Sequence, residues 1–168
     1  MKEMLRTDRL EIRPFSDQDR EELSELLLND DIKKTYMIPD LADQKALDAM
    51  LDRFIALSRS DRRIMRGIYL GARLIGFVNE VEIQNGCLEL GYAIHPTFWG
   101  QGYATEMLRA MLDELLGNPF SAIQTGAFAE NVASMRVMEK CGMQRIDKTE
   151  DIEYRGTCHA CVYYEARA

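Results

Sequence analysis

The hydrophobic and polar positions of the chain change period several times, and each change predicts an element. The opening run LEIRPF alternates between apolar and polar residues, as a half-buried strand does, and DREELSELLL then places leucines at helical spacing. Ser16 followed by Asp19 is typical of the capping box that starts a helix. A second helix is expected from Asp43, with its apolar set at Leu47, Met50, Leu51, Phe54, Ile55 and Leu57.

The middle of the chain, residues 63–96, is predicted to form three consecutive strands. They are joined by the turn LGAR and by the hairpin signal QNG at residues 84–86. The next apolar-periodic helix follows Gly102 and stops at residues 117–119; its apolar positions are Met107, Leu108, Met111, Leu112, Leu115 and Leu116.

The last part of the chain alternates again between strand and helix patterns. AIQTGAFAE is expected to be a strand, and a short helix follows that is capped by Asn131 and ended by Gly142. Two strands near MQRIDKTEDI and CHACVYYEA close the chain. Runs of strands with helices inserted predict an α+β, or mixed α/β, fold, and we expect one domain over residues 1–168.

Composition and charge narrow the class of protein. The 168 residues are 46% hydrophobic and 29% charged, which fits a folded domain. No window reaches the ~18–20 apolar residues of a membrane span, and the start of the chain has no apolar signal core, so we expect a cytoplasmic protein. The net charge of -7 argues against a nucleic-acid partner, because such binding needs a basic surface.

The segment TFWGQGYATEML, residues 97–108, places two glycines just before a helix. Glycine is costly there unless the backbone must approach something that a side chain would block. A helix N-terminus carries unpaired N–H groups and a partial positive charge, which suit an anion such as a phosphate. We therefore expect a pyrophosphate cradle of main-chain donors, made by Gly100, Gln101, Gly102, Tyr103, Ala104 and Thr105.

The glycine pair could also belong to an ordinary turn or to a different kind of nucleotide loop. A Rossmann fingerprint is excluded, because the third glycine and the βαβ layout are missing. No lysine follows the glycines directly, which disfavours a nucleoside-triphosphate loop. The ordinary glycine-rich turn stays open at this point.

A second motif, ENVASMRVMEKCGM, follows the next predicted strand. With this motif and GYAIHPTFWGQGYATEML, the chain resembles the GNAT superfamily of N-acetyltransferases. More narrowly, the chain resembles the ribosomal-protein alanine N-acetyltransferase branch, which the opening TDRLEIRPFSDQD also matches. The resemblance covers nearly the whole chain and is specific at superfamily level, but not for the acceptor. It implies a mostly antiparallel sheet of about seven strands, splayed into a V and flanked by about four helices, with acetyl-coenzyme A (acetyl-CoA) between the parted strands.

The resemblance also implies which residues meet acetyl-CoA. The strand end at Ala93, Ile94 and His95 would offer main-chain groups to the pantetheine arm, and residues 100–105 would hold the pyrophosphate. Asn131 would contact the arm, with Lys140 near the phosphoadenosine end. One departure is visible: where the superfamily often has Gln or Arg, three positions before Gly102, this chain has Trp99.

Acetyl transfer to an amine makes three demands on the protein. The amine, with a pKa near ~10, must lose its proton; the oxyanion must be stabilised; and the departing thiolate benefits from a proton donor. Glu89 lies on the strand that enters the glycine loop, on one face with Gly91, Ala93 and His95, and the resembled branch often has an acid there. Glu89 could equally be a solvated strand residue.

Glu153 is the rival base, because the resemblance places a proposed base at its position. Ser134 would then donate the proton to sulfur. Glu153 could also be a plain surface residue, and Ser134 a plain helix residue. Intact Glu89, Glu153 and Ser134 argue against the alternative from another class, a CoA-binding regulatory module that has lost its chemistry.

The four cysteines are expected to be reduced thiols without a metal: Cys87, Cys141, Cys158 and Cys161. The CHAC run could suggest a zinc site, but a second cysteine pair is missing, and residues three apart on a strand face opposite ways. A covalent acetyl-cysteine at Cys141 is less favoured than direct transfer in a ternary complex, because no His is paired with Cys141 in sequence.

The acceptor is not specified by any motif. It could be a protein N-terminus or an amine-bearing small molecule, and the protein a monomer or a homodimer. The segment between the first two predicted helices is expected to line the acceptor pocket with Tyr36, Met37 and Ile38, although these residues could equally be core.

Overall fold

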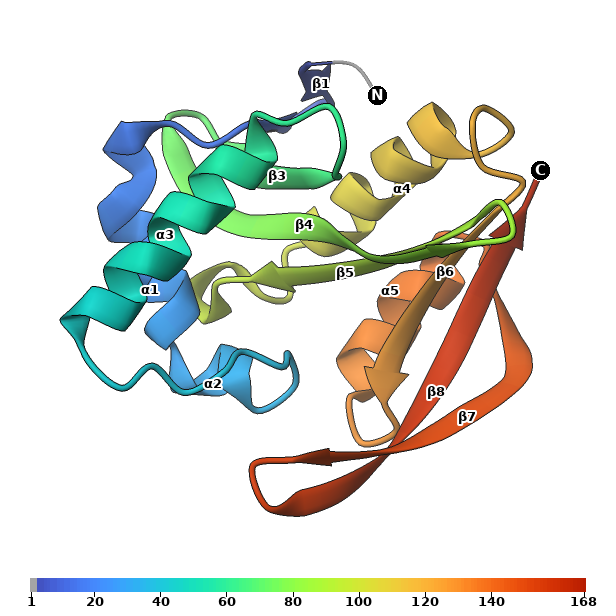
Figure 1. Cartoon of the computed structure of the whole chain (residues 1–168). Coiled ribbons are helices and arrows are strands. Elements are labelled where there is room, and N and C mark those ends of the chain that lie inside the picture. The colour runs from blue at the N-terminus through green and yellow to red at the C-terminus, as the bar shows by residue number, and fades with distance from the viewer. Residues whose placement is uncertain (1–2) are drawn as a thin grey trace. The chain divides into compact units, whose positions relative to one another are not determined.

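The computed structural model describes residues 3–168, and over this range it contains one open, mostly antiparallel sheet with helices inserted between its strands (Figure 1). The strand order is β1-β2-β3-β4-β5-β6-β8-β7. The strands are β1 (Leu5–Arg6), β2 (Leu10–Arg13), β3 (Met65–Leu70), β4 (Arg73–Gln84), β5 (Cys87–Ile94), β6 (Ala122–Phe128), β7 (Gln144–Tyr154) and β8 (Thr157–Arg167). The helices are α1 (Arg20–Leu28), α2 (Asp30–Lys33), α3 (Gln44–Ser58), α4 (Tyr103–Leu115) and α5 (Val132–Lys140).

This architecture confirms the predicted fold class. The described residues form eight strands and five α-helices, one of each more than predicted. The additions are β1, of two residues, and α2, of four residues, which starts at an Asn29 cap. Both are too short for a hydrophobic period to show in the sequence.

The contacts of the chain divide it into two compact units. The first unit comprises residues 3–79 together with Tyr92–Tyr103, and the second comprises Glu80–Gly91 together with Ala104–Ala168. The division passes through β4 and β5 and just after the first residue of α4. Each unit has its own buried side chains.

In the first unit, α3 packs across the strands β3 and β4 (Figure 1). The leucines and isoleucines on the inner stripes of α1 and α3 are buried, as the helical spacing predicts. The core they share with the sheet includes Phe15, Leu23, Leu27, Leu51, Ile55 and Phe77.

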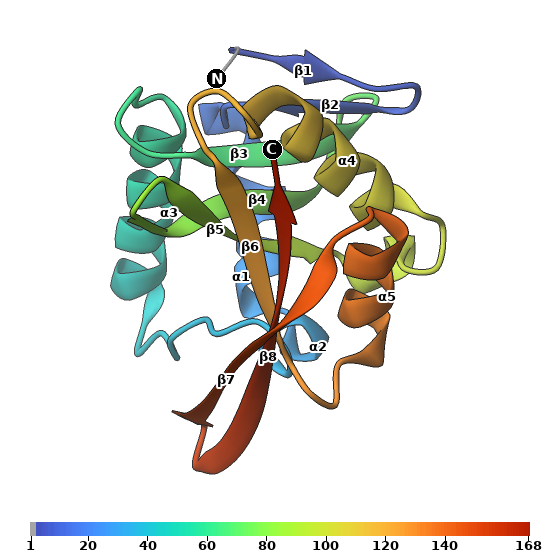
Figure 2. The same cartoon turned by 90° about the vertical axis from the view of Figure 1, so that its right-hand side faces the viewer.

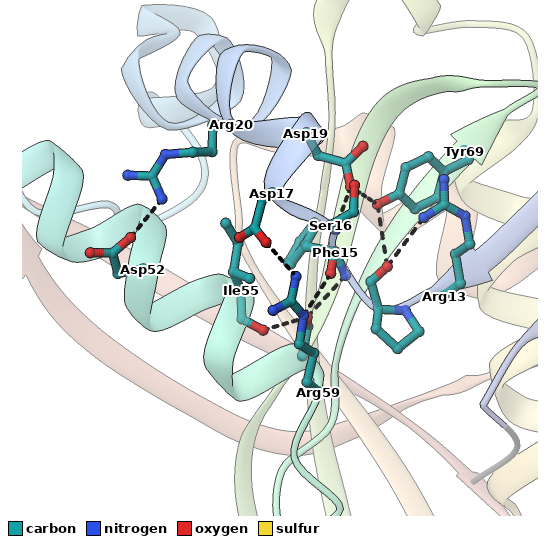
Figure 3. A network of polar contacts seen from close by, with 12 residues as sticks. Arg13, Phe15, Ser16, Asp17, Asp19, Arg20, Asp52, Ile55, Arg59 and Tyr69 are labelled. Carbon is teal, nitrogen blue, oxygen red and sulfur yellow. Dashed lines mark hydrogen bonds and ion pairs between the residues drawn. The ribbon is translucent and has the colours of Figure 1, made fainter.

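A polar network ties the entry of α1 to this core (Figure 3). The Ser16 N–H donates to the Asp19 carboxylate at 2.6 Å, which confirms the predicted capping box. The Tyr69 hydroxyl donates to the same carboxylate at 2.8 Å. Because a buried carboxylate is costly without donors, these two hydrogen bonds explain how Asp19 lies inside. Burial, and next Asp19 itself, raises the pKa of Tyr69.

In the second unit, α4 and α5 lie on the same side of β6 and β8 (Figure 2). Two contacts join the helices: the Arg109 guanidinium donates to the Lys140 carbonyl at 2.6 Å, and the Cys141 thiol donates to the Thr105 carbonyl at 3.4 Å. Apolar side chains of β5 such as Leu88 and Leu90 are fully buried, whereas Glu89 between them is only half-buried. The predicted alternation therefore holds from Cys87 to Gly91, whereas Ala93 and Ile94 at the end of the strand are both buried.

The turns follow the predicted residue chemistry. Asn85 and Gly86 have φ values of 52° and 76°, the left-handed pair that a two-residue hairpin of the QNG type requires. Asp43 accepts from the Ala46 N–H at 2.8 Å and begins α3, and Asn131 accepts from the Ser134 N–H at 3.2 Å and begins α5. Gly142 ends α5 with φ 80°.

Candidate functional site

The glycine loop leads directly into α4. Gly100 and Gly102 have φ values of 73° and 83°, a left-handed conformation that favours glycine. The indole N–H of Trp99 donates to the Ile94 carbonyl at 2.6 Å, so the residue that departs from the superfamily pattern braces the loop against the end of β5. A Cβ on Gly100 would meet nothing described within 4 Å. The loop therefore exposes main chain where a side chain would otherwise stand.

Arg9, which precedes β2, also lies against this loop. Its guanidinium donates to the Gln101 carbonyl at 3.0 Å and lies 4.5 Å from the centre of the Tyr103 ring. A Cβ on Gly102 would lie 3.4 Å from the Arg9 Nη2 atom. The start of α4 thus has an arginine charge beside it, in addition to the partial positive charge of a helix N-terminus. Sequence reasoning did not single out Arg9; its only signal was its place in the opening TDRLEIR.

The end of β5 is held tightly against β4 within the first unit. The His95 N–H donates to the Ile75 carbonyl at 2.8 Å, and Ala93 and Ile94 are buried. A Cβ on Gly76 would lie 2.3 Å from the Ala93 carbonyl oxygen, so only glycine permits this approach.

On its other side, β5 pairs with β6 over a short length. The parallel register joins residues 87–89 to residues 122–124, while β5 continues to Ile94 and β6 to Phe128. Among the described residues, the register pairs stop at Glu89 and Gln124. Glu89 therefore marks the point at which the ladder between these two strands ends.

The second motif forms the first turn and the body of α5. The Asn131 side chain caps the helix by accepting from the Ser134 N–H, and Ser134 is half-buried in the first turn. Lys140 is exposed in the last turn, where its carbonyl accepts from Arg109. Asn131, Ser134 and Lys140 all lie in the second unit, as does Glu89, whereas residues 100–103 lie in the first.

The Glu89 carboxylate lies in a charged cluster that the sequence did not reveal. The Lys148 Nζ atom is 3.6 Å from Glu89 Oε2 and 3.8 Å from Glu150 Oε1. It also lies 3.8 Å from the centre of the Tyr163 ring, whose hydroxyl donates to Glu150 at 2.9 Å. Only 17% of the Glu89 side chain is exposed. Burial raises the pKa of Glu89 above its ordinary value, and the charge of Lys148 opposes that change.

Glu153, the rival base, occupies a different environment. It is exposed and pairs with Cys158, close to the turn between β7 and β8. Across the sheet, Glu89 is the register partner of Gln124 on β6, and Gln124 is in turn paired with Glu165 on β8. Cys158 and Glu165 are seven residues apart, which is about 23 Å of strand at ~3.3 Å per residue. The structure therefore does not bring the two glutamates together.

The residues expected to line the acceptor pocket differ among themselves. Ile38 is buried in the core of the first unit. Tyr36 is half-buried, its ring packs edge-on against Phe77 at 5.2 Å, and its hydroxyl donates to the Asn79 side chain. Met37 is 51% exposed. Of the three, Met37 presents the most side chain to an incoming molecule.

The cysteines lie in separate environments. Cys158 is exposed and Cys161 is buried on β8, as the spacing on a strand predicts. Burial raises the pKa of Cys141, which keeps it a thiol and disfavours it as a nucleophile. Residues 3–168 contain no group of three or more His, Cys, Asp or Glu side chains placed to hold a metal ion. None of the helices formed by these residues is long and apolar enough to cross a membrane.

Comparison with known proteins identifies the family. The profile described as "Acetyltransferase (GNAT) domain" matches residues 9–144. The uncharacterized N-acetyltransferase YoaA of Bacillus subtilis is 30% identical over 149 residues, which cover 84% of this chain and 83% of YoaA. YkkB of the same organism is 33% identical over 156 residues, with 84% and 86% covered.

Solved structures of acetyltransferases share the fold. A GNAT-family acetyltransferase from Bacillus anthracis superposes with a TM-score of 0.82 at 22% identity over 98% of both chains. RimL, a ribosomal L7/L12 alpha-N-protein acetyltransferase in complex with coenzyme A, gives 0.83 at 18% identity, also over 98% of both chains. At these identities the likeness concerns the fold, while the family profile covers most of the sequence. The chain therefore belongs to the GNAT family of acetyltransferases.

Proposed function

We propose that this protein is a cytoplasmic, acetyl-CoA-dependent N-acetyltransferase that transfers the acetyl group directly to a primary amine in a ternary complex. The glycine loop at residues 100–103 is the observation that carries the proposal. Its left-handed glycines expose main chain at the start of a long helix, and Arg9 adds a positive charge beside it. That combination suits a pyrophosphate, which carries negative charge and accepts several hydrogen bonds.

The remaining contacts to acetyl-CoA are assigned by position in the motifs. The main chain at Ala93, Ile94 and His95 continues past the last register pair with β6, and we assign it to the pantetheine arm. Ala104 and Thr105, in the first turn of α4 and in the second unit, are assigned with the glycine loop to the pyrophosphate. Asn131 is assigned to the arm and Lys140 to the phosphoadenosine end, where an exposed lysine suits a phosphate.

Acetyl-CoA supplies the acetyl group as a thioester, and the side chains of the protein handle the protons. We assign the base to Glu89 because its carboxylate is half-buried and has a raised pKa, and a base is most effective when its pKa lies near the working pH. Glu153 is exposed at a hairpin and is the weaker choice. Ser134, in the first turn of α5, is assigned as the donor that protonates the departing sulfur.

The acceptor is proposed to be the amine of a protein N-terminus or of a small molecule. One fold neighbour, from Salmonella typhimurium, is described as modifying the N-terminal serine of the ribosomal protein L7/L12, which supports a peptide amine as one class. An overall charge of -7 favours a cationic acceptor over an anionic one. Met37 is assigned to its binding, with the half-buried Tyr36 beside it, whereas Ile38 belongs to the core.

The test is amine-dependent release of CoA thiol from acetyl-CoA. Wild-type protein is expected to release thiol faster when a panel of N-terminal peptides, polyamines and aminoglycosides is added, and Glu89→Gln is expected to abolish the stimulation without changing acetyl-CoA affinity. Asp113→Asn, at an exposed position of α4, removes one carboxylate of the same unit and is the matched control. If no amine stimulates thiol release by a protein that binds acetyl-CoA, the proposal is wrong.

A further inference from the structure

The Lys148 ammonium is held in one place by neighbours on three strands. On its own strand, β7, Lys148 Nζ lies 3.8 Å from a carboxylate oxygen of Glu150, and on β5 it lies 3.6 Å from a carboxylate oxygen of Glu89. The Lys148 Nζ atom also lies 3.8 Å from the centre of the Tyr163 ring on β8, and the face of an aromatic ring attracts a cation. About a third of the Lys148 side chain is exposed. This is a more constrained arrangement than a lone surface ion pair.

The groups that face the Glu89 carboxylate fall into two classes. Lys148 is the cation among them, and Glu150 of β7 and Glu82 of β4 are anions that disfavour a second negative charge. The charge of Glu89 also contributes to the raised pKa of three neighbouring groups, the thiols of Cys87 and Cys161 and the Tyr163 hydroxyl. Without Lys148, a half-buried carboxylate would face two further carboxylates and no compensating charge from this set.

We propose that Lys148 is a positioning residue for the transfer reaction: its ammonium, fixed over the Tyr163 ring, holds the Glu89 carboxylate ionised and ready to accept the acceptor's proton. This inference rests on the proposed function, in which Glu89 is the base. A base within a buried site has to be ionised before the amine arrives, and a neighbouring cation supplies that condition. Glu150 then has a part as well, since it contacts both Tyr163 and Lys148.

The pH dependence of kcat/KM separates this role from a merely structural one. In Lys148→Met the acid limb is expected to move to higher pH, so that kcat/KM falls about tenfold at a pH on that limb and stays within about twofold at the alkaline plateau. Lys148→Arg keeps the charge and is expected to restore the wild-type profile. Lys45→Met removes an exposed lysine of α3 and is the control for net charge.

A distinct outcome overturns the inference at each step. If folded Lys148→Met has the wild-type pH profile, Lys148 does not hold the carboxylate ionised. If kcat/KM falls equally at all pH values and Lys148→Arg does not restore it, Lys148 only supports packing. Lys148→Gln serves as a second variant should Met disturb the fold, with thermal unfolding used to verify that each variant is folded.

A direct titration separates this inference from the assignment of the base. The Glu89 carboxyl carbon can be followed by ¹³C NMR in protein without substrate, assigned by its loss in Glu89→Gln. Its titration midpoint is expected to rise in Lys148→Met and not in Lys45→Met. An unchanged midpoint overturns the inference. If the midpoint rises but Glu89→Gln keeps wild-type kcat, the inference on ionisation holds and the assignment of Glu89 as the base fails.

Discussion

Replacing Gly102 with valine perturbs the glycine loop at its most constrained point. Gly102 has φ 83°, and an L-residue in this region costs roughly 1–2 kcal/mol, more for a β-branched one. The new Cβ would lie 3.4 Å from Arg9 Nη2, at the edge of ordinary van der Waals contact, so the larger valine side chain would crowd the guanidinium that contacts Gln101 and Tyr103. The substitution thus changes both the main-chain direction and the charge beside it.

The expected loss of acetyl-CoA affinity follows from the hydrogen bonds at stake. A hydrogen bond to a charged group contributes about 1.5–3 kcal/mol, and each 1.4 kcal/mol is about tenfold in affinity. Misdirecting one loop N–H away from the pyrophosphate should therefore weaken binding roughly tenfold to a hundredfold. Losing the Arg9 charge would add to this.

The assay is calorimetric titration of acetyl-CoA, and Gly71→Val is its matched control. Gly71 lies in the turn between β3 and β4 with φ 61° and nothing described within 4 Å of a Cβ, so valine brings a similar backbone strain far along the chain from the loop. Both variants should lose stability, and only Gly102→Val should lose affinity. Gly102→Ala is the milder variant if valine prevents folding. Wild-type affinity in a folded Gly102→Val protein would refute the cradle.

Three further predictions concern the base, the thiol and a cap. Glu89→Gln should lower kcat ~10²–10⁴-fold, and Glu153→Gln should lower it far less. Burial raises the pKa of Glu89, so wild-type kcat/KM should be full above that pKa and should fall as the pH drops through it. This acid limb should flatten in Glu89→Gln. Cys141→Ala should keep most turnover, since burial keeps this thiol protonated, and a large loss in folded protein would revive the covalent mechanism. Asp43→Ala should lower the free energy of unfolding by about 1 kcal/mol through loss of the α3 cap, measured by urea denaturation; no change would mean that its 2.8 Å hydrogen bond contributes nothing.

The parts of the fold that could be predicted from sequence are those set by local rules. The QNG hairpin, the caps at Asp43 and Asn131, and the buried stripes of the helices depend on residues within a few positions of one another. The glycine pair before α4 belongs to the same class, because a left-handed backbone at two positions leaves a direct mark in the sequence.

The contacts that complete the candidate site are long-range and left no such mark. Arg9 and Gln101 are 92 positions apart, and no period or motif joins them. Lys148 lies where the register between β7 and β8 shifts, between Arg145 and Thr149, so simple alternation could not tell which way its side chain points. Spacing along the chain does not distinguish Glu89 from Glu153. The sheet shows that Glu89 is half-buried where β5 and β6 part and that Glu153 is exposed near the turn between β7 and β8, and this difference is our reason for proposing Glu89.

Product identification by mass spectrometry is the most direct test of whether this protein acetylates amines. Purified protein is incubated with acetyl-CoA and a panel of N-terminal peptides, polyamines and aminoglycosides, with Glu89→Gln as the parallel sample. We predict that at least one amine gains a single acetyl group in the presence of the wild-type protein, and that the variant yields far less of the same product. If every amine keeps its mass while the wild-type protein binds acetyl-CoA normally, the protein does not acetylate amines of these classes and the proposed function is contradicted.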